Sequence, residues 1–169
     1  MRKKNAVTFC ASLILSHFLS PLSFADTPPA VFHVARVFDG DTLDVDQDRR
    51  VHLLGIDCPE AVYKGKLYQD AKKEGISIYA MMARGKKAKI FTRGLVQDKI
   101  VRLEFDAQQK DKYGNLLAYV FLEDGTFVNA ELIRVGYAEA RDYPPNTKYH
   151  EFFLKLEEEA KANHLGFWK

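Results

Sequence analysis

The sequence is poor in cysteine and in net charge. Cysteine occurs only twice among 169 residues, too few for a small domain held together by a disulfide framework. The composition, 47% hydrophobic and 28% charged, is that of an ordinary globular domain and excludes collagen-like and low-complexity disordered chains. Because the formal net charge is only +2, a globally basic nucleic-acid binder is excluded. Any attraction to phosphate therefore has to come from local charge or from a metal ion.

Long apolar runs are also scarce, and the main one lies near the N-terminus. Residues 6–24 follow three basic residues, and small residues stand at the two positions that signal peptidase cleavage requires. This pattern predicts a signal peptide over residues 1–25 rather than a membrane span. Cleavage would leave a linker at 26–30 and one domain at 31–169, with a net charge of −1. We expect a monomer that is secreted or periplasmic and has no membrane attachment after cleavage.

The remaining sequence alternates between two kinds of segment. Short stretches rich in Val, Ile and Leu predict strands at 31–38, 42–46, 51–56, 99–105 and 116–122. Apolar residues three and four apart predict helices at 68–82 and 86–96, separated near Gly85, and a short helix at 129–135 ending at Gly136. A last helix is expected to begin at a Thr147 cap and to end at Gly166. About five strands with two or three helices around them indicate an α+β domain.

Two acidic turns are the main candidates for chemistry. Asp-Gly-Asp-Thr at 39–42 and Asp-Cys-Pro-Glu at 57–60 each place carboxylates where a strand begins or ends. The period of two puts Asp41 on the same strand face as Leu43 and Val45, so its carboxylate should point toward the core. Inward carboxylates repel one another unless a cation joins them, and oxygen ligands suit Ca²⁺ better than Zn²⁺. Solvated acidic turns remain the alternative for either motif taken alone.

Other metal and nucleophile patterns are incomplete. Asp44, Asp46 and Asp48 resemble the start of an EF-hand loop, but Arg49 and Gly55 stand where Gly and Glu are needed. We interpret these three aspartates as a solvated strand face. The five histidines form no pair at helical zinc-binding spacing.

Two further features have plain structural explanations. Cys58 could be a nucleophile, but a small, partly buried filler is the favoured interpretation, because the sequence identifies no base for it. A run of basic residues is interpreted as a solvated helix face; it comprises Arg84, Lys86, Lys87, Lys89 and Arg93.

The two acidic turns occur together with three other motifs in a specific order. The stretches are DGDTL at 39–43, VHLLGIDCPE at 51–60, DKYGNLLAY at 111–119, NAELIRVG at 129–136 and NHLGFW at 163–168. Together they resemble the staphylococcal nuclease (thermonuclease) family over about residues 31–169. The resemblance implies a five-stranded barrel of the OB type with about three flanking helices, and Ca²⁺-dependent hydrolysis of DNA or RNA phosphodiesters.

The resemblance also implies roles for the acidic residues. Asp41 and Asp57 match the direct carboxylate ligands of the Ca²⁺ ion, and the backbone carbonyl of Cys58 matches a further oxygen ligand. Asp39 matches an acid outside the direct ligand set. Glu60 matches the carboxylate usually assigned as the general base for the attacking water, a role that suits a carboxylate beside a cation.

The same resemblance points to substrate contacts and to two departures. Lys112 and Tyr113 match positions that contact a terminal phosphate, and Tyr143 matches a base-stacking tyrosine, so single strands are favoured as substrates. The family has arginines that contact the scissile phosphate where this chain has His52 and Asn115. Neither can present a guanidinium fork. A transition-state arginine in phosphoryl transfer can contribute about 10³–10⁵ in rate, so activity is expected to be altered or reduced.

Three functional hypotheses follow. The first is an exported Ca²⁺-dependent nuclease in which another cation, such as Arg50 or Arg141, compensates for the two missing arginines. The second is a catalytically impaired module that binds single-stranded nucleic acid, a nucleotide or a protein partner. The third is a secreted interaction domain that binds no nucleic acid.

Overall fold

The computed structural model describes residues 30–46 and 48–169. The predicted signal peptide and residues 26–29 of the predicted linker lie outside this range, and both stay predictions. Strand β1 runs from Ala30 to Asp39, whereas the sequence predicted a strand at 31–38. Within the described ranges, no helix combines the length and the apolarity needed to cross a bilayer.

Five strands close into a barrel. They are β1 (Ala30–Asp39), β2 (Thr42–Val45), β3 (Arg49–Leu53), β5 (Ile100–Glu104) and β6 (Leu116–Leu122). Their order around the barrel is β1-β2-β3-β6-β5, and every pair is antiparallel except β3 with β6. Branched and aliphatic side chains fill the interior, among them the fully buried Val34, Leu43, Val51, Val101 and Val120. The predicted α+β fold with an OB-type barrel is confirmed.

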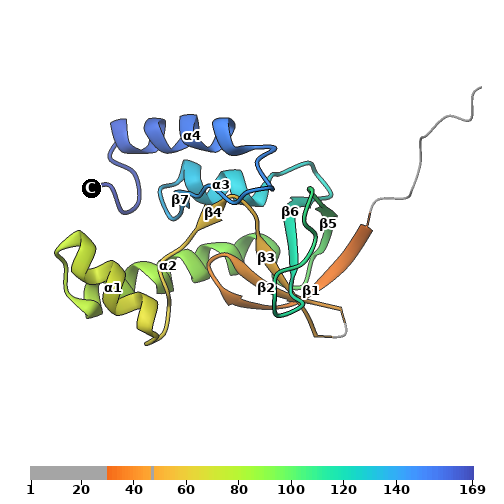
Figure 1. Cartoon of the computed structure of the whole chain (residues 1–169), viewed down its shortest axis with the longest axis horizontal. Coiled ribbons are helices and arrows are strands. Elements are labelled where there is room, and N and C mark those ends of the chain that lie inside the picture. Colours follow the sequence, from red (N-terminus) through yellow and green to blue (C-terminus); the bar gives the residue numbers. More distant parts are fainter. Residues whose placement is uncertain (1–29, 47) are drawn as a thin grey trace, which may run out of the picture.

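In the described part of the chain, four helices surround the barrel, where the resemblance implied about three. They are α1 (Gly65–Glu74), α2 (Ile78–Val96), α3 (Val128–Arg134) and α4 (His150–Ala162). Figure 1 shows α3 and α4 on one side of the molecule, and α1 at the end farthest from β5 and β6. Two further short strands, β4 (Ile56–Asp57) and β7 (Glu139–Ala140), pair with each other outside the barrel. Asp57 therefore lies opposite Glu139.

The helix break predicted near Gly85 was wrong. The chain breaks at Gly75, whose left-handed φ of 68° ends α1, and α2 continues through Gly85. A Cβ at position 85 would lie 2.6 Å from the carbonyl oxygen of Pro59, and closer still to that of Glu60. Gly85 is thus needed for a close backbone approach rather than for ending a helix.

The predicted caps of the last helix were also wrong. Its first residue is His150, after Tyr149, and Thr147 forms no side-chain cap. Its C-terminal cap is Asn163, so Gly166 lies in the turn that follows. A short polar sequence such as this one offers several capping residues, and the turn geometry decides which of them is used.

Asp44 is not solvated as predicted. Its side chain is only 4% exposed and lies between Arg50, whose Nε is 3.0 Å from Oδ1, and Arg36. Burial alone would raise the pKa of Asp44, but the two guanidinium groups outweigh that effect and hold the pKa below its usual value. The expected alternation of buried and exposed side chains does not hold in β2, because both faces of this strand are covered.

The basic run on α2 is solvated only in part. Lys86, Lys87 and Arg93 are exposed, as expected. Arg84 is instead half-buried, where it pairs with Glu74 and donates a hydrogen bond to the carbonyl oxygen of Phe167. It therefore ties α2 to α1 and to the C-terminal segment.

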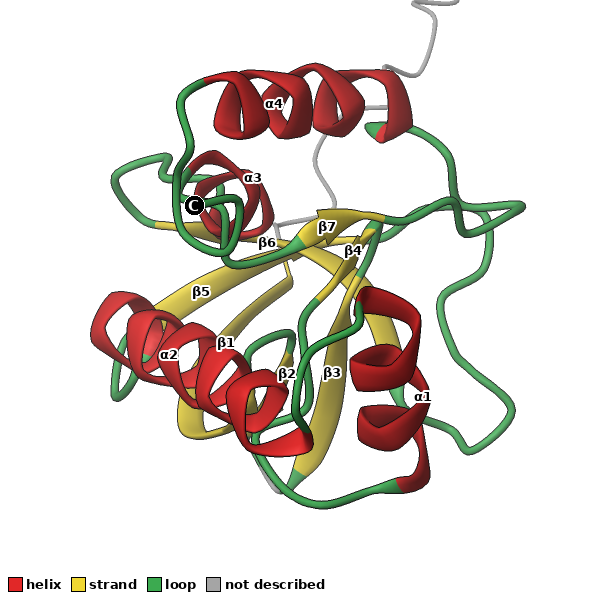
Figure 2. Ribbon diagram, turned by 90° about the vertical axis from the view of Figure 1, so that its left-hand side faces the viewer, coloured by secondary structure: helices red, strands yellow, loops and turns green. Residues whose placement is uncertain are grey.

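The helix pair α1–α2 has a small hydrophobic cluster of its own. Leu67, Ala71 and Met81 are buried together, apart from the main core that fills the barrel and reaches α3 and α4. Figure 2 shows α1 beside α2, in front of the barrel strands.

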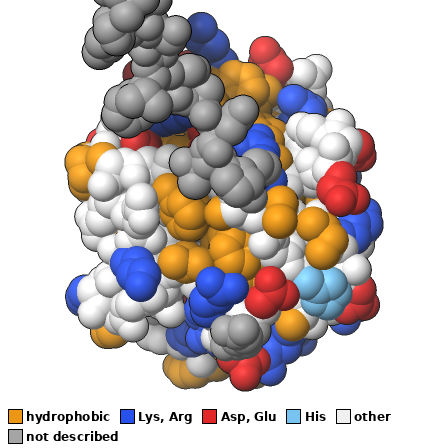
Figure 3. Space-filling model, turned by 90° about the vertical axis from the view of Figure 1, so that its right-hand side faces the viewer, with side chains coloured by type: hydrophobic (Ala, Val, Ile, Leu, Met, Phe, Trp, Pro, Cys, Tyr) orange, Lys and Arg blue, Asp and Glu red, His pale blue; other side chains and the backbone are white. Residues whose placement is uncertain are grey.

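The opposite side of the molecule presents hydrophobic side chains in the middle of its face (Figure 3). Exposed apolar residues of the paired strands β1 and β5 include Val31 and Ile100.

Candidate active site

The two acidic turns meet, and hydrogen bonds cross between them. The backbone N–H of Cys58 donates to Oδ2 of Asp41 at 2.9 Å, and the N–H of Ala61 donates to Oδ1 of Asp39 at 3.2 Å. Each carboxylate of the first turn is therefore held by a backbone group of the second. The predicted convergence of these distant segments is what the structure shows.

Close packing behind the turns explains why Gly40 separates Asp39 from Asp41. A Cβ at position 40 would lie 2.8 Å from both Cβ and Sγ of Cys58 and 2.9 Å from Cβ of Ala88. From α2, the hydroxyl of Thr92 donates to the carbonyl oxygen of Gly40 at 2.6 Å. The first turn is thus pressed against the second turn and against α2.

A cavity of about 400 Å³ opens in front of these turns. Seven of the predicted site residues line it, namely Asp39, Asp41, His52, Asp57, Glu60, Asn115 and Tyr143. The side chain of Cys58 is not among its lining residues. Its thiol is buried, and burial together with the neighbouring aspartates raises its pKa well above the usual value. A buried thiol with a raised pKa agrees with the interpretation of Cys58 as a structural filler and does not favour a nucleophile.

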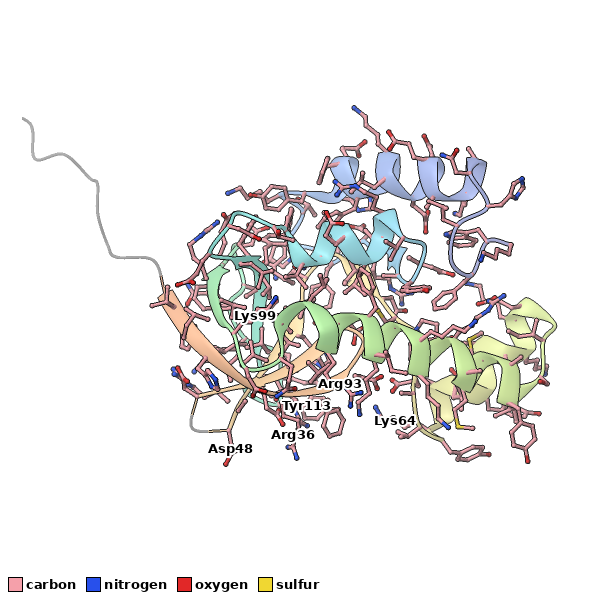
Figure 4. All side chains as sticks on the ribbon, turned by 180° about the vertical axis from the view of Figure 1, so that it is seen from behind. Arg36, Asp48, Lys64, Arg93, Lys99 and Tyr113 are labelled. Carbon is pink, nitrogen blue, oxygen red and sulfur yellow. The ribbon has the colours of Figure 1, made fainter. Side chains whose placement is uncertain are left out.

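Lys112 and Tyr113 lie beside the cavity rather than in it. Tyr113 is 78% exposed and lines a neighbouring hollow together with Arg49, Arg50 and Asn115. The ammonium group of Lys112 lies 5.0 Å from the centre of the Tyr113 ring. In Figure 4, Tyr113, Arg36 and Lys64 come from three distant segments and lie along the same lower edge of the molecule.

His52 and Asn115, for which the resemblance predicts arginines, are both engaged in local hydrogen bonds. Nδ1 of His52 lies 3.1 Å from the hydroxyl of Thr42 on the adjacent strand. The side-chain amide of Asn115 donates to Oδ2 of Asp111 at 2.7 Å, and its backbone N–H donates to Oδ1 of the same residue. The contacts of Asn115 organise the loop before β6, whereas the contact of His52 joins β3 to β2.

Four basic side chains line the cavity, and sequence reasoning named only Arg50 and Arg141 among them. Arg50 is bound to Asp44 and lies 4.1 Å from the centre of the Phe38 ring. Arg141 follows β7, and its Nη1 is 3.6 Å from Oδ2 of Asp57. Both arginines therefore reach the cavity, as the compensation hypothesis requires.

The two basic residues that sequence reasoning missed are Lys64 and Lys66. Lys64 pairs with Glu60, and its Nζ lies 3.5 Å from Oδ2 of Asp39. Nζ of Lys66 lies 3.0 Å from Oδ1 of Asp57. In the sequence, only the spacing of four residues between Glu60 and Lys64 pointed to such a contact, because this spacing favours ion pairs on a helix. The spacing does not reveal that the two residues share a cavity.

Burial shifts the pKa values of two of the carboxyl groups. Burial raises the pKa of Asp41, and the nearby charge of Asp57 adds to this effect. Burial also raises the pKa of Glu60; Lys64 offsets part of the increase, whereas Asp39 adds to it. A raised pKa makes the ionised Glu60 carboxylate a better proton acceptor than a solvated one.

The donor set is consistent with a hard divalent cation. Among residues 30–46 and 48–169, no three His, Cys, Asp or Glu side chains form a metal-binding cluster. The predicted ligand set needs only the two carboxylates of Asp41 and Asp57 together with a backbone carbonyl oxygen. Both carboxylates line the cavity, and a cation between them would offset their repulsion, which adds to the effect of burial on the pKa of Asp41. Oxygen ligands suit a hard divalent cation better than they suit Zn²⁺, which favours Cys and His.

Comparison with known proteins agrees with this geometry. A sequence profile described as "Staphylococcal nuclease homologue" matches residues 50–169, a range that includes Asp57 and Glu60. The chain is 39% identical over 150 residues to the thermonuclease of Staphylococcus intermedius, covering 87% of this chain and 81% of that protein. It belongs to the staphylococcal nuclease family.

Two further relatives agree with this family assignment. The thermonuclease of Staphylococcus hyicus is 36% identical over 140 residues, which cover 81% of this chain and 75% of that protein. Endonuclease YncB of Bacillus subtilis (strain 168) is 36% identical over 138 residues, which cover 79% of this chain and 59% of that protein. The resemblance inferred from the motifs is thereby confirmed.

Proposed function

We propose that this chain is an exported, Ca²⁺-dependent nuclease that hydrolyses phosphodiester bonds of DNA or RNA and prefers single strands. The observation that carries the proposal is the pair of crossing hydrogen bonds, Cys58 N–H to Asp41 and Ala61 N–H to Asp39, which bring both acidic turns to one cavity beside Glu60. The family membership and the names of the relatives, thermonuclease and endonuclease, support the same function.

Each residue of the site has a part in this proposal. Asp41, Asp57 and the carbonyl of Cys58 would hold the ion, with Asp39 orienting the turns from behind. A bound Ca²⁺ ion supplies positive charge that neutralises the phosphodiester and lowers the cost of ionising a nearby water molecule. Glu60 accepts the proton of that water at its carboxylate, for which its raised pKa is suitable.

The substrate contacts are proposed from the same cavity. Tyr143, 38% exposed at the cavity rim, and Tyr113 offer ring faces on which unpaired bases can stack. Lys112, beside Tyr113, offers a charge to a terminal phosphate. We propose that the protein acts as a monomer, in a secreted or periplasmic location.

Cleavage of single-stranded DNA or RNA during a Ca²⁺ titration tests this function. We expect cleavage that rises with Ca²⁺, stops on chelation and falls by about 10²–10⁴-fold in the Glu60→Gln variant. Glu158→Gln, an exposed position on α4, is the matched control and should cleave like the wild type. A wild type that cleaves no better than Glu60→Gln would contradict the proposal.

The second candidate function is a binding module that has lost hydrolysis. The hydrogen bonds that hold His52 to Thr42 and Asn115 to Asp111 favour it, because neither side chain offers a guanidinium group to the scissile phosphate. Restoring both arginines in a His52→Arg, Asn115→Arg double variant separates the two. A large gain in cleavage would show an otherwise intact site. Ca²⁺-dependent thermal protection by a nucleoside bisphosphate would argue against a domain that binds no nucleic acid.

A further inference from the structure

Lys66 holds a position that neither its sequence motif nor the family resemblance assigns. It lies in the first turn of α1, and its Nζ is 3.0 Å from Oδ1 of Asp57 and 2.9 Å from Oδ2 of Asp70. The same side chain lines both the active-site cavity and a second cavity of about 320 Å³. Lys66 therefore stands at the junction of the two hollows, beside a proposed metal ligand.

The packing of α1 directs Lys66 toward the cavity. Leu67 and Ala71, four residues apart, form the buried face of α1 and pack with Met81 of α2. Lys66 and Asp70, also four residues apart, form the adjacent face and pair with each other, and Lys66 also reaches Asp57. The amphipathic pattern of this one helix thus presents a lysine to the site.

The other basic residues of the cavity are less suited to bind an anion. Arg50 is the partner of Asp44, and its withdrawal would leave a carboxylate that is only 4% exposed without that charge. Lys64 is paired with Glu60, the proposed base. Arg141 is 63% exposed, whereas Lys66 is 39% exposed, so a contact with Lys66 is less screened by water.

We infer that Lys66 binds a non-bridging oxygen of the substrate phosphate beside Asp57 and supplies the positive charge that positions 52 and 115 lack. The inference rests on the proposed function. An ammonium group has three donors, so one can stay on Asp70 while others turn to the phosphate once Asp57 is engaged by a cation. Asp70 is then the positioning residue, because it keeps the ammonium group at the cavity.

Binding of a nucleoside 3′,5′-bisphosphate to the Lys66→Gln variant tests the inference. We expect an affinity about 10- to 100-fold lower than that of the wild type, as for loss of a hydrogen bond to a charged group. The dependence of affinity on salt should also become shallower, because one phosphate contact is gone. Lys72→Gln, an exposed position on the same helix, is the matched control and should bind like the wild type. Lys66→Arg should retain most of the affinity.

Three outcomes are informative. If Lys66→Gln binds the bisphosphate as tightly as Lys72→Gln, the inference is overturned. If Lys66→Gln weakens the bisphosphate and the uncharged nucleoside equally, Lys66 has a merely structural role, which also overturns it. If the wild type cleaves no nucleic acid but Lys66→Gln still loses bisphosphate affinity and salt dependence, the nuclease proposal fails while the phosphate contact stands.

Discussion

The two walls of the cavity are held in place by different parts of the molecule. In the carboxylate wall, backbone hydrogen bonds hold Asp39 and Asp41, the pairing of β4 with β7 holds Asp57, and Gly40 packs closely against Cys58 and Ala88 of the main core. The cationic wall consists of Lys66 in the first turn of α1 and Lys64, the residue just before this helix, and the buried residues of α1 belong to the small separate cluster. The carboxylates of the proposed metal site are thus supported by the main core. A shift in the position of α1 would cost less packing, because fewer buried residues hold this helix.

Replacing one buried leucine with alanine in each region is expected to give the largest difference between the two regions in stability and activity. Leu43 and Leu67 are both fully buried, the first in the barrel and the second under α1. Leu43→Ala should lower the free energy of unfolding by about 3–5 kcal/mol. Leu67→Ala should cost about 2–3 kcal/mol, because the small cluster collapses more easily, and it should raise KM by releasing Lys66. Denaturant unfolding and steady-state kinetics measure both effects. Equal losses of stability with unchanged KM would remove the distinction between the walls.

A Cβ added at Gly85 should disturb the carboxylate wall without touching its side chains. Since it would collide with the backbone of Pro59 and Glu60, we expect Gly85→Ala to cost about 1–3 kcal/mol and to lower kcat by displacing Glu60. Gly94, also within α2, has open space around it. Gly94→Ala should be stabilising by about 0.5–1 kcal/mol and leave kcat unchanged. Thermal unfolding and single-strand cleavage assays test this pair; matching behaviour of the two variants would speak against the close contact.

The smallest expected effect on stability comes from substituting Asp44. This residue is the partner of Arg50, a basic residue of the cavity that lies on the barrel rather than on α1. Because Arg50 and Arg36 hold the pKa of Asp44 below its usual value, its ionised form stabilises the fold. This contribution is full above the unfolded-state pKa of about 3.9 and is lost as the pH falls through the lower folded-state pKa. Asp44→Asn should therefore cost about 1 kcal/mol at neutral pH, and the difference should vanish in acid. A difference that stays constant across an acid titration of stability would refute this assignment.

Local pattern was enough to predict the barrel strands. The five strands need only short, branched segments between turns, and Leu43 and Val45 are buried on the face where alternation places them. The motif order then predicted which acidic residues meet, and both turns line one cavity.

The errors have a common physical cause, which is contact between distant segments. The sequence around Gly85 suggests a helix break. A glycine is needed there instead because the backbone of Glu60 approaches too closely to leave room for a Cβ atom. Asp44 reads as solvated until Arg36 and Arg50 are brought to it. Lys66 reads as one more surface lysine, because only the docking of α1 on α2 brings it to Asp57.

Calcium binding to the unliganded protein tests the central claim most directly. Titration calorimetry of the wild type should show one Ca²⁺ site, which Asp41→Asn and Asp57→Asn each weaken severely. Asp48→Asn, at an exposed aspartate that does not line the cavity, should bind Ca²⁺ like the wild type. If the wild type binds no Ca²⁺, or if all three variants bind it equally well, the two acidic turns do not form a shared cation site.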